Sequence, residues 1–282
     1  MVKKTIYDLY QMKKKGERAV WITAYDAPTA SYAEAAGIDM LLVGDSLGMC
    51  VCGYGGTVPV TMEQCIHHTR AVRTGAPNTF VIGDMPFLSY QISIEEAVRN
   101  AGRFLKEGGA DAIKLEGGKR VARQIRAIVD AGIVVFGHIG LTPQSSGQLG
   151  GFKAQGRTIA SAKLMIEDAL AVQEAGAHCL LVEAVTPEVT KIIHDRLRIP
   201  VYGIGAGIHT DGQLLIVADL LGIFEAFTPK FVKKYANLGE EMKKAFIAYR
   251  DDVRSGAFPG PEHTYSMLEG EAEKLDELRR DA

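Results

Sequence analysis

Acidic side chains follow three short apolar runs of the sequence, each close to the point where the run ends. Asp45 comes just after MLLV, Asp84 follows TFVIG, and Glu116 follows AIKL. Mg²⁺ commonly takes one or two carboxylates together with water and substrate oxygens. No His/Cys cluster lies near these acids in the sequence, which makes zinc or copper less suitable. We therefore expect a magnesium site, although each acid alone would serve equally well as a helix cap.

A lysine, a histidine and a fourth acid lie at the ends of neighbouring runs. Lys114 lies one pleat before its loop, where it needs an anionic partner: a substrate carboxylate or a nearby acid. A Schiff-base role is the less attractive alternative. Glu183 follows CLLV, which predicts burial, a raised pKa and the role of general base, unless it caps the next helix. His138 could hydrogen-bond a carbonyl or enolate oxygen, or only the backbone around Leu141.

Together these groups predict metal-assisted enolate chemistry on a small 2-oxo acid. A divalent ion can chelate the carboxylate and keto oxygens and polarise the carbonyl. A positioned glutamate can remove the neighbouring proton while the metal and a lysine stabilise the enolate oxygen. The enolate then attacks an electrophile, or the reverse step cleaves a carbon–carbon bond. The residues do not identify the electrophile, and GIGAG at Gly203–Gly207 allows close backbone approach to a ligand without specifying one.

The elements that must position these groups repeat one unit: a short apolar run, a loop rich in Gly, Asp or Pro, and a helical stretch. Runs of Val, Ile and Leu without polar alternation are typical of parallel strands buried on both faces. Eight runs are predicted as strands, the last less clearly than the others: Ala19–Ala24, Met40–Val43, Thr79–Gly83, Ala112–Leu115, Ile133–Gly137, Cys179–Val182, Pro200–Ile204 and Ile223–Phe227.

Helices are predicted between the strands, and several end at glycine, the usual residue after a last turn. They include Ala27–Ala36, Ser93–Glu107, Arg120–Ala131, Ser161–Ala175 and Pro187–Arg196. Eight strand–helix units predict an α/β fold, a (β/α)8 TIM barrel, whose functional groups gather at the C-terminal ends of the strands. A doubly wound sheet is the alternative, but it often has a glycine-rich loop where this chain has AYDAPTA. We expect a single domain over residues 1–282, with an N-terminal helical cap over 1–18 and a C-terminal helical extension over about 234–282.

Bulk composition argues against several classes of protein. Of 282 residues, 47% are hydrophobic, and the net charge is -2. This balance predicts neither disorder nor a nucleic-acid or anionic-membrane partner. The only basic run, Lys13–Lys15, is predicted to be a solvated helix end. The four cysteines form no paired metal motif and are expected to be reduced thiols. We find no signal-peptide pattern and no apolar stretch long enough to cross a bilayer, so the expected location is the cytoplasm.

Long strings of the sequence resemble the ketopantoate hydroxymethyltransferase family, and the likeness runs from about residue 3 to about 265. The most specific strings are GDSLGM and GHIGLTPQS. The strings that carry the resemblance are VGDSLGMCVCGYGGTVPVT (43–61), HTRAVRTGAPN (68–78), GDMPFLSY (83–90), IKLEGG (113–118), GHIGLTPQS (137–145), GGFKAQGR (150–157) and GIGAGIHTDGQ (203–213).

The resemblance implies a reaction and a metal site. A hydroxymethyl group would pass from 5,10-methylenetetrahydrofolate to 3-methyl-2-oxobutanoate, giving ketopantoate on the route to pantothenate and coenzyme A. The enzyme would depend on Mg²⁺, one ion per subunit. Asp45 and Asp84 would hold the metal and contact the substrate, and Glu116 would belong to the metal shell, directly or through water.

The resemblance also implies roles for the remaining groups. Lys114 would bind the substrate, Ser46 would bind its carboxylate, His138 would lie beside the oxo acid, and Glu183 would be the base. Members of the family are typically decamers of two pentameric rings, so a homodecamer is expected.

Two rivals remain at this point. A lyase or mutase of the phosphoenolpyruvate/isocitrate type usually carries a cysteine loop of the KKCGH kind, which this sequence lacks. A non-catalytic folate- or oxo-acid-binding barrel would keep its whole function in a Glu183→Gln variant.

Overall fold

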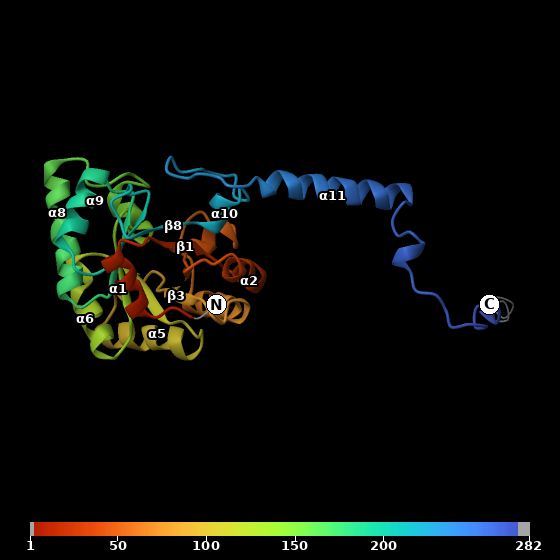
Figure 1. The fold of residues 1–282 in the computed structure, drawn as a ribbon, viewed down its shortest axis with the longest axis horizontal. Coiled ribbons are helices and arrows are strands. Elements are labelled where there is room, and N and C mark those ends of the chain that lie inside the picture. Colours follow the sequence, from red (N-terminus) through yellow and green to blue (C-terminus); the bar gives the residue numbers. More distant parts are fainter. Residues whose placement is uncertain (1–2, 276–282) are drawn as a thin grey trace. The chain divides into compact units, whose positions relative to one another are not determined.

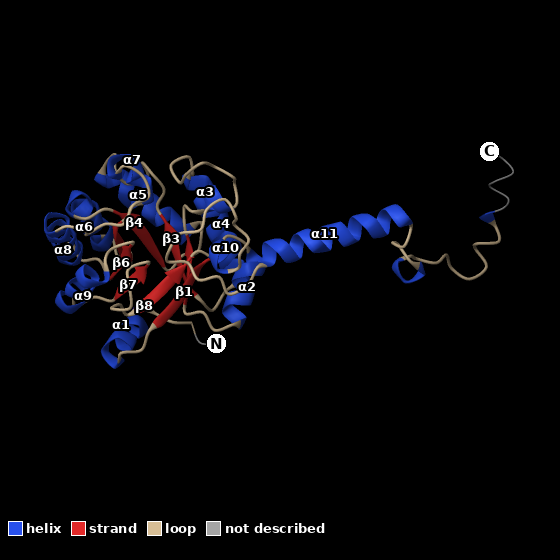
Figure 2. Cartoon of the chain, turned by 90° about the horizontal axis from the view of Figure 1, so that it is seen from above, coloured by secondary structure: helices blue, strands red, loops and turns tan. Residues whose placement is uncertain are grey.

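Eight parallel strands close into a barrel in the computed structural model, which describes residues 3–275. The strand order follows the chain, and β1 pairs with β8 to complete the ring. Figure 2 shows the strands in the centre with helices around them. The predicted (β/α)8 barrel is therefore confirmed. The strands are β1 Ala19–Thr23, β2 Met40–Val43, β3 Phe80–Asp84, β4 Ala112–Glu116, β5 Val135–Gly140, β6 Cys179–Glu183, β7 Val201–Ile204 and β8 Gly212–Leu215.

Helices lie between successive strands (Figure 1), except between β7 and β8, which a loop joins. Side-chain oxygens of Asp26, Thr61, Ser93 and Thr158 accept from backbone N–H groups in the first turns of α2, α4, α5 and α8, which satisfies donors that a helix start leaves unpaired. The α-helices are α1 Ile6–Lys15, α2 Ala27–Ala35, α3 Leu47–Cys50, α4 Met62–Gly75, α5 Ile94–Lys106, α6 Ala122–Asp130, α7 Ser146–Leu149, α8 Ile159–Glu174, α9 Pro187–Arg196, α10 Val217–Leu220 and α11 Leu238–Ser255. Short 3₁₀ turns are η1 Lys119–Val121, η2 Pro143–Ser145 and η3 Pro261–His263.

The eighth strand is the clear error of the sequence-based prediction. It is Gly212–Leu215, not Ile223–Phe227. The sequence GQLL hides the strand because Gln213 is exposed and donates its amide to Gly207 O and Thr210 Oγ1. The apolar side chains of residues 223–227 instead belong to a loop after α10, and two of them line the cavity described below.

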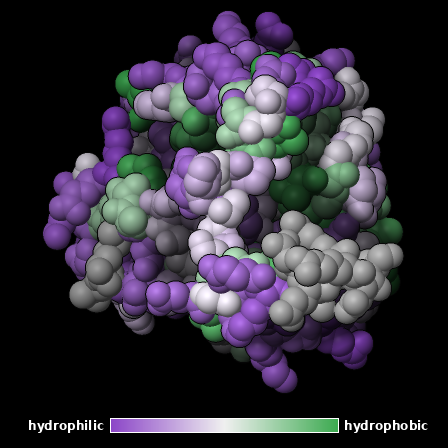
Figure 3. Space-filling model, turned by 90° about the vertical axis from the view of Figure 1, so that its right-hand side faces the viewer, coloured by the Kyte–Doolittle hydropathy of each residue, from purple (hydrophilic) through white to green (hydrophobic). Residues whose placement is uncertain are grey.

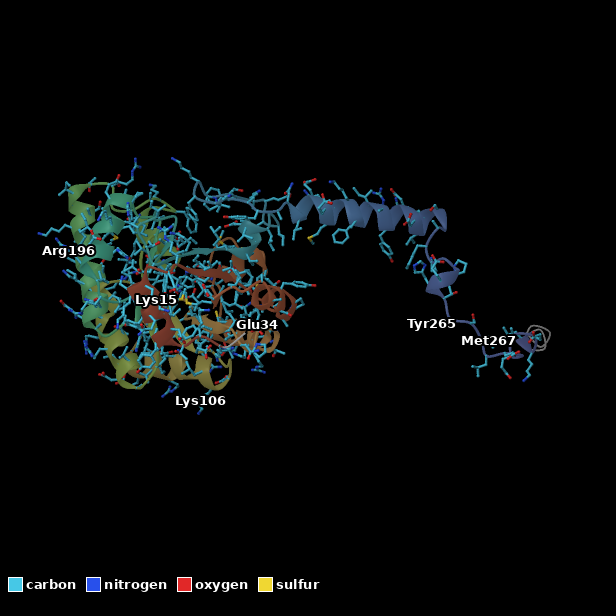
Figure 4. All side chains as sticks on the ribbon, viewed as in Figure 1. Lys15, Glu34, Lys106, Arg196, Tyr265 and Met267 are labelled. Atoms are coloured by element: carbon cyan, nitrogen blue, oxygen red, sulfur yellow. The ribbon has the colours of Figure 1, made fainter. Side chains whose placement is uncertain are left out.

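The interior of the barrel is a layer of apolar side chains that alternate along the strands. Trp21 packs against Phe136 and Tyr202, with ring centroids 6.1 and 5.4 Å away. Leu9 of α1 is fully buried in the same cluster, so the N-terminal helix closes the end of the barrel where the strands begin. A second, larger cluster fills the space between the strands and the surrounding helices. On the outside, Glu34 of α2 (labelled in Figure 4) accepts from the Thr79 hydroxyl and so ties α2 to the start of β3.

The N-terminal segment is fastened to the barrel by three ion pairs. Each joins a lysine of residues 3–13 to an aspartate just before a strand: Lys3–Asp111 (2.5 Å), Lys4–Asp39 (2.9 Å) and Lys13–Asp211 (2.8 Å). The helix predicted within residues 1–18 is therefore present as α1. The solvated position expected for the whole basic run is wrong for Lys13, whose side chain is only 17% exposed. Lys15, labelled in Figure 4, is exposed.

The chain divides into two compact units, residues 1–235 and 236–282. The first contains the barrel. The second contains α11 and η3, so a helix is present where the C-terminal extension was expected. Within the extension predicted to be helical, residues 267–274 form turns or irregular structure, and residues 276–282 lie outside the described part. The expectation of one domain over the whole chain stays a prediction.

The described surface is mixed in polarity. Hydrophilic residues predominate on the face drawn in Figure 3, and apolar residues appear there in separate patches. Within residues 3–275, no helix is both long enough and apolar enough to cross a membrane.

Candidate active site

The alternation that fills the barrel interior also brings the site residues inward. In β3, Phe80 and Ile82 lie two residues apart and both belong to the cluster in the barrel interior. Asp84 lies two residues after Ile82. In β4 the interior Ala112 is followed at the same spacing by Lys114 and Glu116. Because side chains two residues apart share a strand face, the last inward positions of these strands project into the mouth of the barrel.

Lys114 is the cation at the centre of the site. Its Nζ lies 2.6 Å from Asp84 Oδ1 and 3.8 Å from Glu116 Oε1. All three side chains are at most 3% exposed. The cross-strand register pairs Asp84 with Lys114, so the ion pair joins neighbouring residues of β3 and β4. The structural pairing that the sequence left open for Lys114 is thus present, and a substrate carboxylate would have to share this cation.

His138 connects Glu116 to Glu183. Its Nδ1 lies 3.5 Å from Glu116 Oε1, and its Nε2 lies 3.2 Å from Glu183 Oε2. The register pairs Glu116 with His138 on β5, and Glu183 ends β6. Glu183 is less deeply buried than CLLV predicted, since its side chain keeps 15% exposure. The sequence left open that His138 contacts only the backbone around Leu141. This alternative is wrong, because each ring nitrogen lies close to a carboxylate.

Asp45 and Ser46 follow β2 and extend this row of groups. The backbone N–H of Asp45 donates to Asp84 Oδ2 at 3.1 Å. The Ser46 hydroxyl lies 2.7 Å from the phenol oxygen of Tyr25, which follows β1. All seven residues proposed from the sequence therefore come from five adjacent strands, β2 to β6, or from the residues just after them.

Two further residues hold this row in place and were not proposed from the sequence. Gln144 donates its side-chain amide to Asp45 Oδ2 (2.9 Å) and to Met85 O (2.9 Å), and its backbone N–H to Glu116 Oε2 (3.1 Å). The Tyr90 hydroxyl donates to Gln144 Oε1 at 2.8 Å. Both lie within strings that carried the resemblance, GHIGLTPQS and GDMPFLSY, but an amide in a loop has no chemical signal of its own.

Burial and mutual charge set the ionisation of the site. Burial raises the pKa of Asp45 well above its usual value, and the charges of Asp84 and Glu116 raise it further. Burial also raises the pKa of Asp84, against the opposing effect of Lys114. Burial acts to lower the pKa of Lys114, but Asp84, Glu116 and Asp45 outweigh it and raise that pKa. Three buried carboxyl groups thus share one lysine, and this crowding favours a proton on Asp45.

The histidine and Glu116 shift in opposite directions for the same reason. Burial and Lys114 act to lower the pKa of His138, but the nearby carboxylates of Glu116 and Glu183 raise it to about 9. Burial acts to raise the pKa of Glu116, yet His138 and Lys114 lower it overall. The two carboxylates thus favour the protonated imidazole, while Lys114 Nζ, 3.3 Å from Nδ1, opposes it.

These residues line one cavity of about 370 Å³ at the mouth of the barrel. Its polar side is built by Asp45, Ser46, Asp84, Lys114, Glu116, His138 and Glu183. The segment after β8 supplies a largely apolar side, with Ile216, Asp219, Phe224, Phe227, Pro229 and Phe231. This apolar side follows β8, which in the ring lies three strands from β5, with His138, and two strands from β6, with Glu183.

The donor set fits a hard cation that also uses oxygens from outside the protein. Asp84 Oδ1 and Glu116 Oε1 are buried and accept no hydrogen bond of normal geometry, although Lys114 lies close to both. No group of three His, Cys, Asp or Glu side chains among residues 3–275 is arranged to hold a metal ion by itself. Mg²⁺ commonly takes only one or two carboxylates and completes its shell with water and substrate. Asp45 and Asp84 could serve as that pair.

Comparisons with known proteins agree on one family. Residues 3–261 match the family model of ketopantoate hydroxymethyltransferase. A 3-methyl-2-oxobutanoate hydroxymethyltransferase of Alkaliphilus metalliredigens is 65% identical over 271 residues, 96% of each chain. That of Syntrophobacter fumaroxidans is 54% identical over 265 residues, 94% of each chain.

Solved structures support the fold alone, at low sequence identity. A 2,3-dimethylmalate lyase structure covers 98% of this chain and 99% of its own, with a TM-score of 0.61 and 18% identity. A phosphonopyruvate hydrolase complex with oxalate and Mg²⁺ covers 99% and 98%, with a TM-score of 0.59 and 14% identity. The full-length sequence match, rather than this shared barrel, decides the family: the chain belongs to the ketopantoate hydroxymethyltransferases and is an enzyme of the transferase class.

Proposed function

We propose that the protein transfers a hydroxymethyl group from 5,10-methylenetetrahydrofolate to 3-methyl-2-oxobutanoate through an enolate. The observation that carries the proposal is the row Asp45, Asp84, Lys114, Glu116 and His138, which ends at Glu183 in one buried cavity. This row combines acids, a fixed cation and a partly exposed carboxylate, the groups that enolate chemistry on a 2-oxo acid requires. The names of the close relatives support the same reaction.

The metal of the proposal is Mg²⁺, held by Asp45 and Asp84 with Glu116 nearby. When bound, it would polarise the keto group and stabilise negative charge on its oxygen. Gln144 contributes by orientation, since its amide fixes Asp45 Oδ2 and its backbone N–H fixes Glu116 Oε2. The two carboxylates would thus be held in position before any substrate arrives, which reduces the reorganisation needed during reaction.

The remaining residues bind the oxo acid and move its proton. Lys114 offers a buried positive charge to the substrate's negative oxygens, and Ser46, oriented by Tyr25, offers a hydroxyl to its carboxylate. Glu183 removes the proton from C3, and His138 holds Glu183 through Nε2. C3 then bonds to the methylene carbon of the folate, whose bonds to N5 and N10 both break. Water supplies the hydroxyl group of ketopantoate, and its other proton and the proton taken from C3 end on the two nitrogens of the released tetrahydrofolate.

The cellular setting forms part of the proposal. The product would enter pantothenate and coenzyme A synthesis in the cytoplasm, and the enzyme would work as a homodecamer.

The first test is exchange of the C3 proton of 3-methyl-2-oxobutanoate for deuterium in D₂O with Mg²⁺, followed by NMR. We expect exchange that EDTA abolishes and that Mg²⁺ restores. Glu183→Gln should lower the exchange rate by at least about 100-fold, the range for loss of a general base. Glu188→Gln, which makes the same change at an exposed residue of α9, is the matched control and should exchange normally.

The second half of the test adds the folate. Ketopantoate should form only when 5,10-methylenetetrahydrofolate is present. Absence of both exchange and product would refute the proposal, and oxaloacetate- and isocitrate-type substrates would then be tried. Full activity in Glu183→Gln would instead remove Glu183 from the role of base.

A further inference from the structure

One buried carboxylate in the cavity has no role in the chemistry proposed above. Asp219, on α10, is 5% exposed and lines the cavity, yet no hydrogen bond or ion pair reaches its side chain from the described residues. Burial raises the pKa of this carboxyl to about 6, against the opposing charge of Lys234. A buried acid without a partner destabilises a fold. Its presence at the wall of a binding cavity therefore points to a ligand that supplies the missing hydrogen bonds.

The protein groups around Asp219 do not supply them. Thr23 also lines the cavity, but among the described residues its hydroxyl makes no hydrogen bond to Asp219 and accepts from the backbone N–H of Val217. The thiol of Cys50 is close enough to feel Asp219, since its pKa is raised by burial and by the charge of that carboxylate. A thiol is a weak donor and cannot satisfy two carboxylate oxygens.

The rest of this side of the cavity is apolar and aromatic. Phe224, Phe227 and Phe231 line it together with Ile216 and Pro229. Aromatic side chains favour a flat ring system as their neighbour. A carboxylate among them selects a ring that presents two adjacent N–H donors, because such a pair can bond both carboxylate oxygens at once.

We propose that Asp219 binds the pterin ring of the folate co-substrate, through the ring N3–H and the exocyclic 2-amino group, with the ring against Phe224, Phe227 and Phe231. This inference rests on the proposed function. It places the pterin on the side of the cavity closed by β7, β8 and β1, and leaves the side with Lys114 and His138 for the oxo acid.

The test measures binding of tetrahydrofolate, under anaerobic conditions, by isothermal titration calorimetry. Asp219→Asn should raise the dissociation constant about 30-fold, because the amide cannot accept hydrogen bonds from both donors and the negative charge is lost. The matched control is Asp130→Asn, the same change at an exposed residue at the end of α6, and its dissociation constant should equal that of the wild type. Asp219→Glu, which keeps the carboxylate, should retain more affinity than Asp219→Asn.

A second arm removes the donor from the ligand. A tetrahydrofolate analogue with a methyl group in place of the 2-amino group should bind the wild type at least about tenfold more weakly than tetrahydrofolate. In Asp219→Asn, replacing the 2-amino group by methyl should change the dissociation constant much less, because the carboxylate that bonds this group is already gone. Guanosine, which carries the same donor pair, is included in order to separate a pterin site from a guanine site.

The outcomes separate this inference from the proposed function. Unchanged tetrahydrofolate binding in Asp219→Asn, with C3 exchange of the oxo acid intact, overturns the inference and leaves the proposed function standing. Equal binding of the two folates by the wild type overturns it whatever the variant does, and so does tighter binding of guanosine than of tetrahydrofolate. Failure of the wild type both to bind tetrahydrofolate and to exchange the C3 proton overturns both.

Discussion

Replacing Asp219 by asparagine should make the unliganded protein more stable at neutral pH. The carboxyl pKa rises from 3.8 to about 6 on folding because the group is buried, and Lys234 only partly opposes this rise. Below pH 3.8 the carboxyl group is neutral in both the folded and the unfolded chain, so its ionisation does not lower the free energy of unfolding. Between pH 3.8 and about 6 the group ionises in the unfolded chain but not in the folded one, and the free energy of unfolding falls as pH rises. Above about pH 6 the folded chain also carries the buried charge, and the free energy of unfolding falls no further.

The size of the effect follows from the shift. About two pKa units at about 1.4 kcal/mol each set an upper limit of about 3 kcal/mol at pH 7.5 and about half of that at pH 5. Because the carboxylate borders a cavity that solvent can enter, we expect roughly 1–2 kcal/mol at pH 7.5. The ionisable neighbours, Cys50 and Lys234, are unchanged in the variant.

Urea unfolding followed by fluorescence measures this difference. The single tryptophan, Trp21, is buried in the barrel interior and reports unfolding of the barrel directly. Wild type, Asp219→Asn and Asp130→Asn would be compared at pH 5 and pH 7.5, without ligands and at one protein concentration, since assembly would add a concentration-dependent term. A wild type more stable than Asp219→Asn at pH 7.5, or a difference that does not change with pH, would refute the reasoning.

Three further predictions concern positions outside the reacting groups. Gln144→Ala should raise the Mg²⁺ concentration needed for C3 exchange by about 10- to 100-fold, because Asp45 and Glu116 lose the groups that orient them; an unchanged Mg²⁺ titration would contradict this. Leu9→Ala should lower the free energy of unfolding by about 3 kcal/mol, measured by urea titration, since it empties a fully buried position; a loss below about 1 kcal/mol would show that α1 does not close the barrel. Burial lowers the pKa of His178 below 6.5, so its contribution to stability is present above pH 6.5 and lost as pH falls through its folded pKa. His178→Asn should therefore show a weaker loss of stability between pH 7 and 5 than the wild type, and an identical pH profile would count against this explanation.

The barrel and most of its site were predictable because one physical rule serves both. A strand buried on both faces is a short apolar run, and a polar residue at its end has few roles other than capping or function. Asp84, Lys114 and His138 are visible in the sequence for that reason. Their distances to one another are set by the register between strands, which no single run contains.

The errors and omissions have equally local causes. The strand Gly212–Leu215 was hidden by the exposed Gln213, while the apolar residues of the loop after α10 resembled a strand although they line the cavity. Gln144 was missed because its partners come from three other parts of the chain. Asp219 was missed because its significance lies in the absence of a partner, which becomes visible only once the chain is folded.

The three ion pairs that fasten the N-terminal segment have a consequence for synthesis of the chain. Residues 3–13 leave the ribosome first, but their partners are Asp39, Asp111 and Asp211. The last of these contacts cannot form until residue 211 has been made, and closure of the barrel between β1 and β8 waits for the same region. Leu9 and the basic helix must therefore stay available, without their final partners, while most of the barrel is being translated. Contacts this distant in sequence slow folding, so a nascent chain that stops short of β8 would be exposed to aggregation through the open edge of β1.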